Sequence, residues 1–317
     1  MASTLDIPGA CFRAGTGTPV VLLHGVSMSW RVWKPVLPLL TTRHDVFAPT
    51  LAGHRGGPTP SPDRRPGVST LVDLLCEQLD EAGIETPHVV GNSLGGWVAL
   101  ELARRGRARS VIAISPAGSW RSSRDLAQLL WMFRFAHLSM RTPAMAVVTR
   151  YRRLQSGSLR RLMAHPERIP AEEMVELIAD FVECPLFAAL ATGAAKLHQI
   201  EELDAAHCPV HIAWAGKDRL IPYRRFGDPM RALIRGGEFS TLPGVGHVPM
   251  YDDPELVAQT ILAVTTRIDE LAATQPTARP RRKTTARGGT TFARTGRPGH
   301  RRSSQHQLEH PEGSTAR

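Results

Sequence analysis

The sequence predicts an α/β fold, with a mostly parallel central β-sheet, helices on both faces and an inserted α-helical cap. Three observations lead to this fold class. Short apolar runs alternate with helical stretches up to residue 118, the alternation stops from 119 to 198, and it resumes from 199 to 273. Strands that alternate with helices are typical of βαβ units and a parallel sheet. We therefore assign 1–118 and 199–273 to the core and 119–198 to the cap.

The first expected elements are short strands and one helix. Ala10–Arg13 and Pro19–His24 are apolar runs on either side of Gly15-Thr16-Gly17, and this pattern predicts a β-hairpin. A helix is expected from about Trp30 to Leu40, and a third strand at Asp45–Ala48.

The later elements continue the alternation. Ser69–Ala82 is amphipathic, with four leucines on one helical face, and therefore predicts a surface helix. Four strands and a closing helix are expected after it, at Val89–Gly91, Val111–Ser115, Val210–Ala215, Glu238–Leu242 and Pro254–Ala273. The proline that opens the last helix is acceptable in a first turn.

Residues 91–96, Gly-Asn-Ser-Leu-Gly-Gly, lie between an apolar strand-like run and the helical run Trp97–Arg105. A sharp strand-to-helix turn holds its central serine in a strained conformation and leaves no room for side chains two residues before and after it. Gly91 and Gly95 meet this requirement. The motif therefore indicates that Ser93 is a nucleophile.

A serine hydroxyl becomes a good nucleophile only beside a base, which in turn needs a carboxylate to orient it. Asp218 and His247 each follow a predicted strand, as Ser93 does, and the chain order is Ser, Asp, His. The carboxyl ends of parallel strands lie at one edge of the sheet, where open α/β proteins bind their ligands. We therefore predict a catalytic triad of Ser93, Asp218 and His247.

Other titratable residues near these motifs are expected to have structural roles. His24 is expected to support the turn that follows it, and His54 belongs to a different loop. Asp228, Asp252 and Asp253 occupy helical or post-histidine positions, where a solvated face is the ordinary interpretation.

With these motifs in place, the chain resembles the α/β-hydrolase family over roughly residues 5–272. Val20–Gly25 is similar to the family's early strand and His-Gly turn, Leu51–Gly56 to its D-x-P-G-x-G loop, and Asp252–Glu255 to the segment after its histidine. Two departures occur at that loop, where the common aspartate and proline are replaced by Thr50 and Ala52.

The resemblance implies an oxyanion hole, in which backbone N–H groups stabilise the negative oxygen of a tetrahedral intermediate. At the matching positions of this chain, the donors are the N–H groups of Leu94, which also begins a helix, and of Val26. Ser27, the next residue, is the alternative to Val26. The resemblance also implies that the cap covers the catalytic edge and shapes the substrate pocket.

Aromatic and basic side chains are frequent in the cap. Trp120, Trp131 and Phe135, together with Phe133, are expected either to line an apolar substrate pocket or to pack the cap helices against one another. Most of the cap arginines are expected on solvated faces, although one could bind a substrate carboxylate. These arginines include Arg121, Arg124, Arg134 and Arg141.

The apolar stretches, the first residues and the cysteines indicate where the protein is located and which bound groups are not expected. The longest apolar stretch, Leu126–Val148, is interrupted by polar residues and cannot span a membrane. The first six residues lack the pattern of a secretory signal, so a cytoplasmic location is expected. Neither a zinc site nor a disulfide framework is predicted, because the four cysteines lack C-x-x-C spacing. They are Cys11, Cys76, Cys184 and Cys208. No cofactor is expected either, since the predicted triad needs none.

The basic charge is concentrated at the end of the chain. Residues 279–317 hold ten Lys or Arg against two Glu, which is a net +8 of the chain's +10. Residues 274–317 are poor in large apolar side chains and are therefore expected to be a disordered tail. Clustered positive charge could give this tail a weak contact with nucleic acid or an anionic surface.

These observations favour a serine hydrolase that cleaves a carboxylic ester-type bond of a small acyl substrate, with water releasing the acid from an acyl-enzyme. Hydrolysis of carbon–carbon bonds and cofactor-free peroxidation through a peracid would use the same triad. Epoxide and haloalkane hydrolases of the family are less expected, because they carry an aspartate where Ser93 stands. A catalytically silent ligand-binding protein is the alternative of a different class, and the oligomeric state stays open.

Overall fold

The structure is a computed structural model that describes residues 10–64, 67–140, 151, 154, 157, 159–192 and 197–274. Within the described residues, no helix is long and apolar enough to cross a membrane. The predicted tail beyond residue 274 and Arg141 lie outside this part of the chain.

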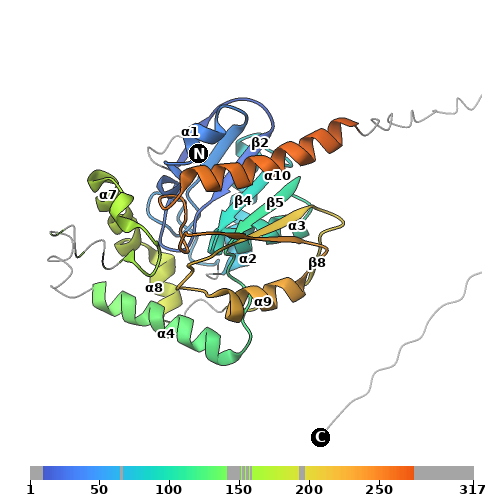
Figure 1. Cartoon of the computed structure of the whole chain (residues 1–317). Coiled ribbons are helices and arrows are strands. Elements are labelled where there is room, and N and C mark those ends of the chain that lie inside the picture. The colour runs from blue at the N-terminus through green and yellow to red at the C-terminus, as the bar shows by residue number, and fades with distance from the viewer. Residues whose placement is uncertain are drawn as a thin grey trace, which may run out of the picture. The chain divides into compact units, whose positions relative to one another are not determined.

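A seven-stranded sheet organises the unit that ends at residue 275 (Figure 1). The strand order is β1-β3-β2-β4-β5-β7-β9, and every neighbouring pair is parallel except β1 with β3. The mostly parallel sheet is therefore confirmed. The strands are β1 Cys11–Ala14, β2 Pro19–Leu23, β3 Asp45–Pro49, β4 His88–Asn92, β5 Ser110–Ile114, β7 Val210–Ala215 and β9 Glu238–Leu242.

Helices cover both faces of this sheet. Because successive side chains of a strand point to opposite faces, Val21 and Leu23 pack in one apolar cluster with α2, α3 and α9, and Val20 and Leu22 in a second cluster with η2, α1 and α10. These helices are η2 Trp30–Trp33, α1 Leu37–Leu40, α2 Val68–Glu81, α3 Leu94–Arg104, α9 Tyr223–Leu233 and α10 Pro254–Thr274.

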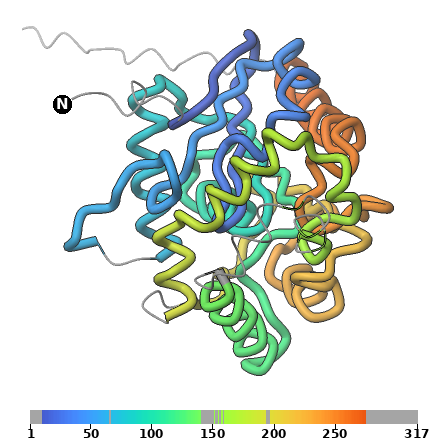
Figure 2. The backbone as a smooth tube through the Cα atoms, turned by 90° about the vertical axis from the view of Figure 1, so that its left-hand side faces the viewer, coloured from blue at the N-terminus to red at the C-terminus, as the bar shows by residue number. Residues whose placement is uncertain are grey.

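In the described part of the segment between β5 and β7, the helices with defined bounds are α4 Ser123–Met140, η3 Pro166–Arg168, α7 Ala171–Val182 and α8 Pro185–Thr192. We call α4, α7 and α8 the insert helices. They gather on one side of the unit in Figure 1, and Figure 2 views the unit from that side. A small second sheet follows, in which β6 Leu203–Asp204 pairs with β8 Ile234–Arg235.

Two sequence predictions near the N-terminus are wrong. The expected hairpin does not form, because β1 pairs with β3 and not with β2. Gly15 and Gly17 instead adopt φ of +92° and +110° where the chain crosses the turn before β3, and a β-carbon on Gly15 would lie 2.1 Å from the His44 carbonyl oxygen. The single helix expected at 30–40 is divided into η2 and α1, since Pro35 has no N–H to continue the helical bonding.

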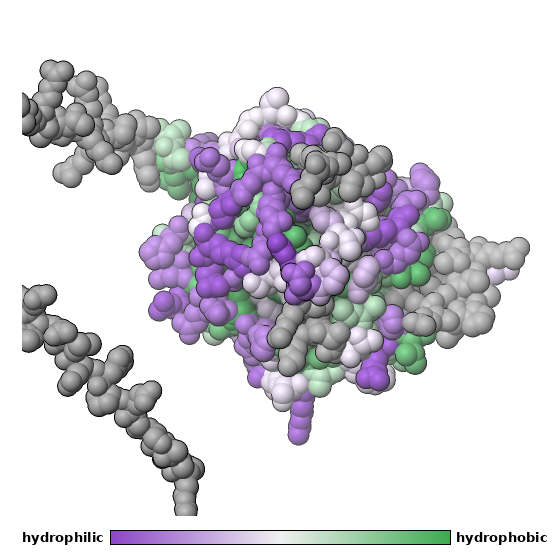
Figure 3. Space-filling model, turned by 180° about the vertical axis from the view of Figure 1, so that it is seen from behind, coloured by the Kyte–Doolittle hydropathy of each residue, from purple (hydrophilic) through white to green (hydrophobic). Residues whose placement is uncertain are grey.

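Exposed apolar side chains are concentrated on the insert helices, namely Trp131, Phe135, Leu138, Val175 and Val182. The face seen in Figure 3 is mainly hydrophilic, with its hydrophobic side chains in separate spots. The four cysteines are free thiols, and burial raises the pKa of Cys184 and of Cys208 to about 11.

Candidate active site

Ser93 occupies a strained turn between β4 and α3. Its φ is +57°, a value that non-glycine residues rarely adopt and that persists only where the surroundings enforce it. A β-carbon on Gly91 would lie 2.1 Å from the Gly95 carbonyl oxygen, and one on Gly95 would lie 2.3 Å from the Leu23 carbonyl oxygen. Both positions therefore require glycine, as the motif predicts.

Asp218 and His247 lie just past the ends of β7 and β9 and contact each other. Nδ1 of His247 is 2.7 Å from Oδ2 of Asp218, and both side chains are almost fully buried. The other oxygen, Oδ1, accepts the N–H groups of Leu220 and Ile221 at 2.9 Å each. Because these bonds fix the carboxylate, Nδ1 is the ring nitrogen that donates, and Nε2 is left as an acceptor.

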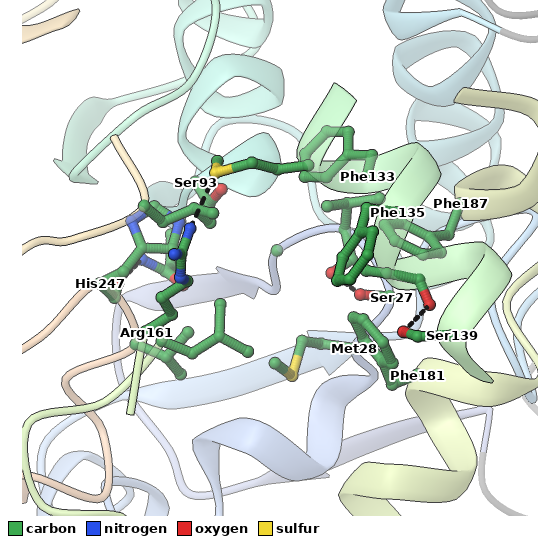
Figure 4. A pocket seen from close by; sticks show the side chains of 18 of the residues that line it. Ser27, Met28, Ser93, Phe133, Phe135, Ser139, Arg161, Phe181, Phe187 and His247 are labelled. Carbon is green, nitrogen blue, oxygen red and sulfur yellow. Dashed lines mark hydrogen bonds between the residues drawn. The ribbon is translucent and has the colours of Figure 1, made fainter. Parts of the chain in front are cut away.

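Nε2 of His247 is buried and has no hydrogen-bond partner in the described part of the chain. Ser93 and His247 line the same pocket, and Figure 4 shows them at the same end of it. A buried polar atom without a partner is uncommon in a folded protein and calls for an explanation. Here it leaves an imidazole acceptor facing the pocket that Ser93 also lines.

The pocket is a cavity of about 430 Å³ with a mainly apolar lining. Trp131 and Phe135 both belong to it, and they stack on each other at 5.6 Å between ring centroids on α4. Trp120 lies instead in a smaller hollow of about 40 Å³, which shares Val26, Ser93 and Phe133 with the larger pocket.

The two segments that carry the predicted oxyanion donors adjoin Ser93. Leu94 is the first residue of α3, where N–H groups have no partner within the helix. The loop after β2 passes close by, since a β-carbon on Gly25 would lie 3.3 Å from Cβ of Ser93. Val26 follows in that loop, and Ser27 after it has φ +61° and donates its hydroxyl to the Val26 carbonyl oxygen at 2.6 Å.

A family model described as "Alpha/beta hydrolase family" matches residues 20–260 of the chain. The chain belongs to the α/β-hydrolase family. It is 38% identical over 198 residues to the epoxide hydrolase EphH of Mycobacterium tuberculosis. The aligned region covers 61% of this chain and 92% of the relative.

The chain is also similar to proteins that are named esterases. It is 27% identical over 250 residues to a pimeloyl-[acyl-carrier protein] methyl ester esterase of Aromatoleum aromaticum, covering 74% of this chain and 93% of the relative. Among solved structures, a thermophilic esterase from Thermogutta terrifontis matches with a TM-score of 0.63 at 23% identity, over 82% of this chain and 93% of that one, a likeness of fold. The chain is accordingly a hydrolase.

His24 supports the fold of the hydrolase, as expected. Its Nδ1 contacts the Gly25 carbonyl oxygen at 2.8 Å, and its Nε2 accepts the Leu51 N–H at 2.9 Å. The ring of His54 packs edge-on against the ring of His24, with 4.8 Å between their centroids. Burial lowers the pKa of His54 to about 4 and that of His24 well below its usual range, so both rings are neutral at pH 7.

Asp252 is not on a solvated face, and that prediction is wrong. Its carboxylate is fully buried and accepts three backbone N–H groups, from Ala164 at 2.9 Å, His165 at 2.6 Å and Gly246 at 2.7 Å. Gly246 directly precedes His247 in the chain. Asp252 therefore fixes the histidine loop to the segment before η3, which belongs to the insertion between β5 and β7.

Replacement of Asp252 by asparagine is expected to destabilise the hydrolase by about 2 kcal/mol, because an amide has one acceptor oxygen where the carboxylate serves three donors with two. Urea unfolding followed by circular dichroism measures this difference. Asp228→Asn is the matched control, since the Asp228 side chain is 42% exposed and pairs with the exposed Arg121. Equal unfolding midpoints for the two variants would contradict the assigned role.

Two further residues of the site carry no clear signal in the sequence. Asn92 donates its amide to the carbonyl oxygens of Ile114 at 3.1 Å and His247 at 2.8 Å, and so fixes the histidine loop to the end of β4. Arg161 lines the pocket, whereas Arg124 and Arg134 are exposed outside its lining. No motif marks Arg161, because its neighbours in the pocket come from distant parts of the chain.

Proposed function

We propose that this hydrolase is a serine carboxylesterase that acts on esters with an apolar portion, with Ser93 as nucleophile, His247 as base and Asp218 as orienting acid. The observation that carries the proposal is the unpartnered, buried Nε2 of His247 in the pocket that Ser93 lines. An acceptor nitrogen held in this tautomer by a buried carboxylate is what proton removal from a serine hydroxyl requires.

The proposed reaction has two halves. Oγ of Ser93 attacks the ester carbonyl as His247 takes its proton, and the N–H groups of Leu94 and Val26 stabilise the oxyanion. His247 then gives the proton to the alcohol as it leaves, and the acyl group stays on Ser93. Water activated by His247 attacks this acyl-enzyme and releases the acid, while Asp218 keeps the imidazole oriented.

The pocket lining supports an apolar substrate portion. Phe133, Phe181 and Phe187 lie at the end opposite Ser93 and His247 in Figure 4. Phe187 forms close ring contacts with both other rings, with centroids 5.4 Å from Phe133 and 4.9 Å from Phe181. Aromatic walls favour burial of an aryl or alkyl group. We include Trp131, Phe135 and, through the smaller hollow, Trp120 among the substrate-binding residues.

Epoxide hydrolysis is the second candidate, because the relative at 38% identity is named an epoxide hydrolase. Attack of Ser93 on an epoxide carbon would form an alkyl ether, which has no carbonyl for water to attack, so the enzyme would not be regenerated. Epoxide turnover here would therefore need His247 to activate water directly. Hydrolysis of carbon–carbon bonds and peracid formation use the same triad as ester cleavage and stay open.

Labelling with a fluorophosphonate tests the proposal, because only an activated serine reacts readily with this probe. We expect one label per chain, located at Ser93 by mass spectrometry, and turnover of 1-naphthyl esters from acetate to octanoate. Styrene oxide is assayed in parallel. Absence of both labelling and ester turnover would contradict the proposal, and styrene oxide turnover alone would favour the second candidate.

A further inference from the structure

Arg161 lies at the catalytic end of the pocket. Its side chain is exposed at the rim, and Figure 4 shows it on the side of Ser93 and His247, away from the phenylalanines. Nη1 is 3.2 Å from Sδ of Met132 on α4, so the guanidinium reaches from its own segment toward the insert helix that forms another wall. A thioether sulfur is only a weak acceptor.

The charge of Arg161 is not neutralised within the pocket. Among the described residues, none of the side chains that line this cavity is an aspartate or glutamate, and Arg161 forms no salt bridge. The arginines around the unit are commonly paired, as Arg55 is with Glu176 and Asp180. A separate surface hollow is lined by Arg160, Arg161 and Arg219, which adds positive charge on the same side.

We infer that Arg161 binds a carboxylate of the substrate, a few bonds from the ester carbonyl, while an apolar group of the same molecule fills the aromatic end. This inference rests on the proposed ester hydrolysis and narrows its substrate class to esters that carry one free carboxylate. A guanidinium presents paired donors that match the two oxygens of a carboxylate. The apolar lining and the unpaired guanidinium of Arg161 thus fit an amphiphilic ester with its charge near the reacting atoms.

Two pairs of esters test this inference. The first pair is 1-naphthyl hydrogen glutarate and its neutral amide, 1-naphthyl glutaramate, which differ only in the charge of the acyl end. The second pair is 4-acetoxybenzoate and 4-acetoxybenzamide, which carry the difference on the alcohol half. We expect the wild-type protein to favour the anionic member of at least one pair, and Arg161→Gln to reduce that kcat/KM preference about tenfold, mainly through KM.

Arg134→Gln is the matched control, because Arg134 is an exposed arginine of α4 outside the pocket lining. It should keep the wild-type preference. The inference would be overturned if, for both pairs, Arg161→Gln kept the wild-type kcat/KM preference for the anionic ester. It would also be overturned if Arg134→Gln lost this preference to the same extent as Arg161→Gln.

A binding measurement separates this inference from the proposed function. N-phenylsuccinamic acid is an anionic amide that an esterase is not expected to hydrolyse. Calorimetry should show about tenfold weaker binding to Arg161→Gln than to the wild-type protein. If no ester is hydrolysed but this difference is found, the proposed function fails and the carboxylate site stands. If esters are hydrolysed and no difference is found, the carboxylate site fails alone.

Discussion

Ser93→Ala is expected to lower kcat for 1-naphthyl esters by at least about 10⁴-fold, because it removes the only atom proposed to form the acyl-enzyme. Alanine keeps the β-carbon of Ser93, which already adopts φ +57°, so the strain of the turn is unchanged. The thermal midpoint should therefore stay close to that of the wild-type protein. Purified variant and wild type are compared by initial rates and by thermal unfolding.

Ser115→Ala provides the matched control for this result. Ser115 is another buried serine with a positive φ, +41°, and its Oγ accepts the Ala215 N–H at 3.0 Å away from the pocket lining. Its replacement should lower stability and leave kcat within about twofold of the wild-type value. Ester turnover that survives in Ser93→Ala would rule out Ser93 as the nucleophile. Epoxide turnover that survives while ester turnover is lost would indicate direct activation of water.

Much of this site could be predicted because its signals are local. Each of the residues Ser93, Asp218 and His247 follows a strand, and β7 and β9 have the bounds that the sequence predicts, Val210–Ala215 and Glu238–Leu242. The apolar run of β7, which Gly216 follows directly, can be recognised from a few residues alone. The parallel sheet then brings the ends of distant strands to one edge, so a local pattern is enough to predict a long-range contact.

The missed features depend on partners that are remote in sequence. Asp252 is buried because donors from Ala164 and His165, almost ninety residues earlier, surround its carboxylate. Asp252 lies in a charged segment that is typical of the protein surface, so the sequence around it does not predict that backbone donors bury it. Strand β1 pairs with β3 and not with its neighbour in sequence, β2. Gly15, after β1, adopts a positive φ that other residues rarely adopt, but its sequence context has no recognisable turn motif for this pairing. Arg161 joins the pocket through the path of the insertion, which composition alone does not determine.

Asp218→Asn is expected to lower kcat for esters by about 10³-fold to 10⁴-fold while the side chain keeps its position. In the wild-type protein, Oδ1 accepts the N–H groups of Leu220 and Ile221, and Oδ2 contacts Nδ1 of His247. An asparagine must place its single oxygen toward the two backbone donors, so its NH₂ group faces Nδ1. An NH₂ donor there requires Nδ1 to accept, and the ring proton moves to Nε2. His247 then cannot take the proton of Ser93.

The measurement that distinguishes this tautomer effect from simple loss of structure is the comparison of Asp218→Asn with Asp218→Ala. Alanine leaves Nδ1 without any partner and also frees the N–H groups of Leu220 and Ile221, so it should destabilise the protein by about 2 kcal/mol, whereas asparagine should not. Equal unfolding midpoints for the two variants would contradict the proposed hydrogen bonding. A kcat for Asp218→Asn within tenfold of the wild-type value would contradict the role of Asp218, because the base would then work in either tautomer.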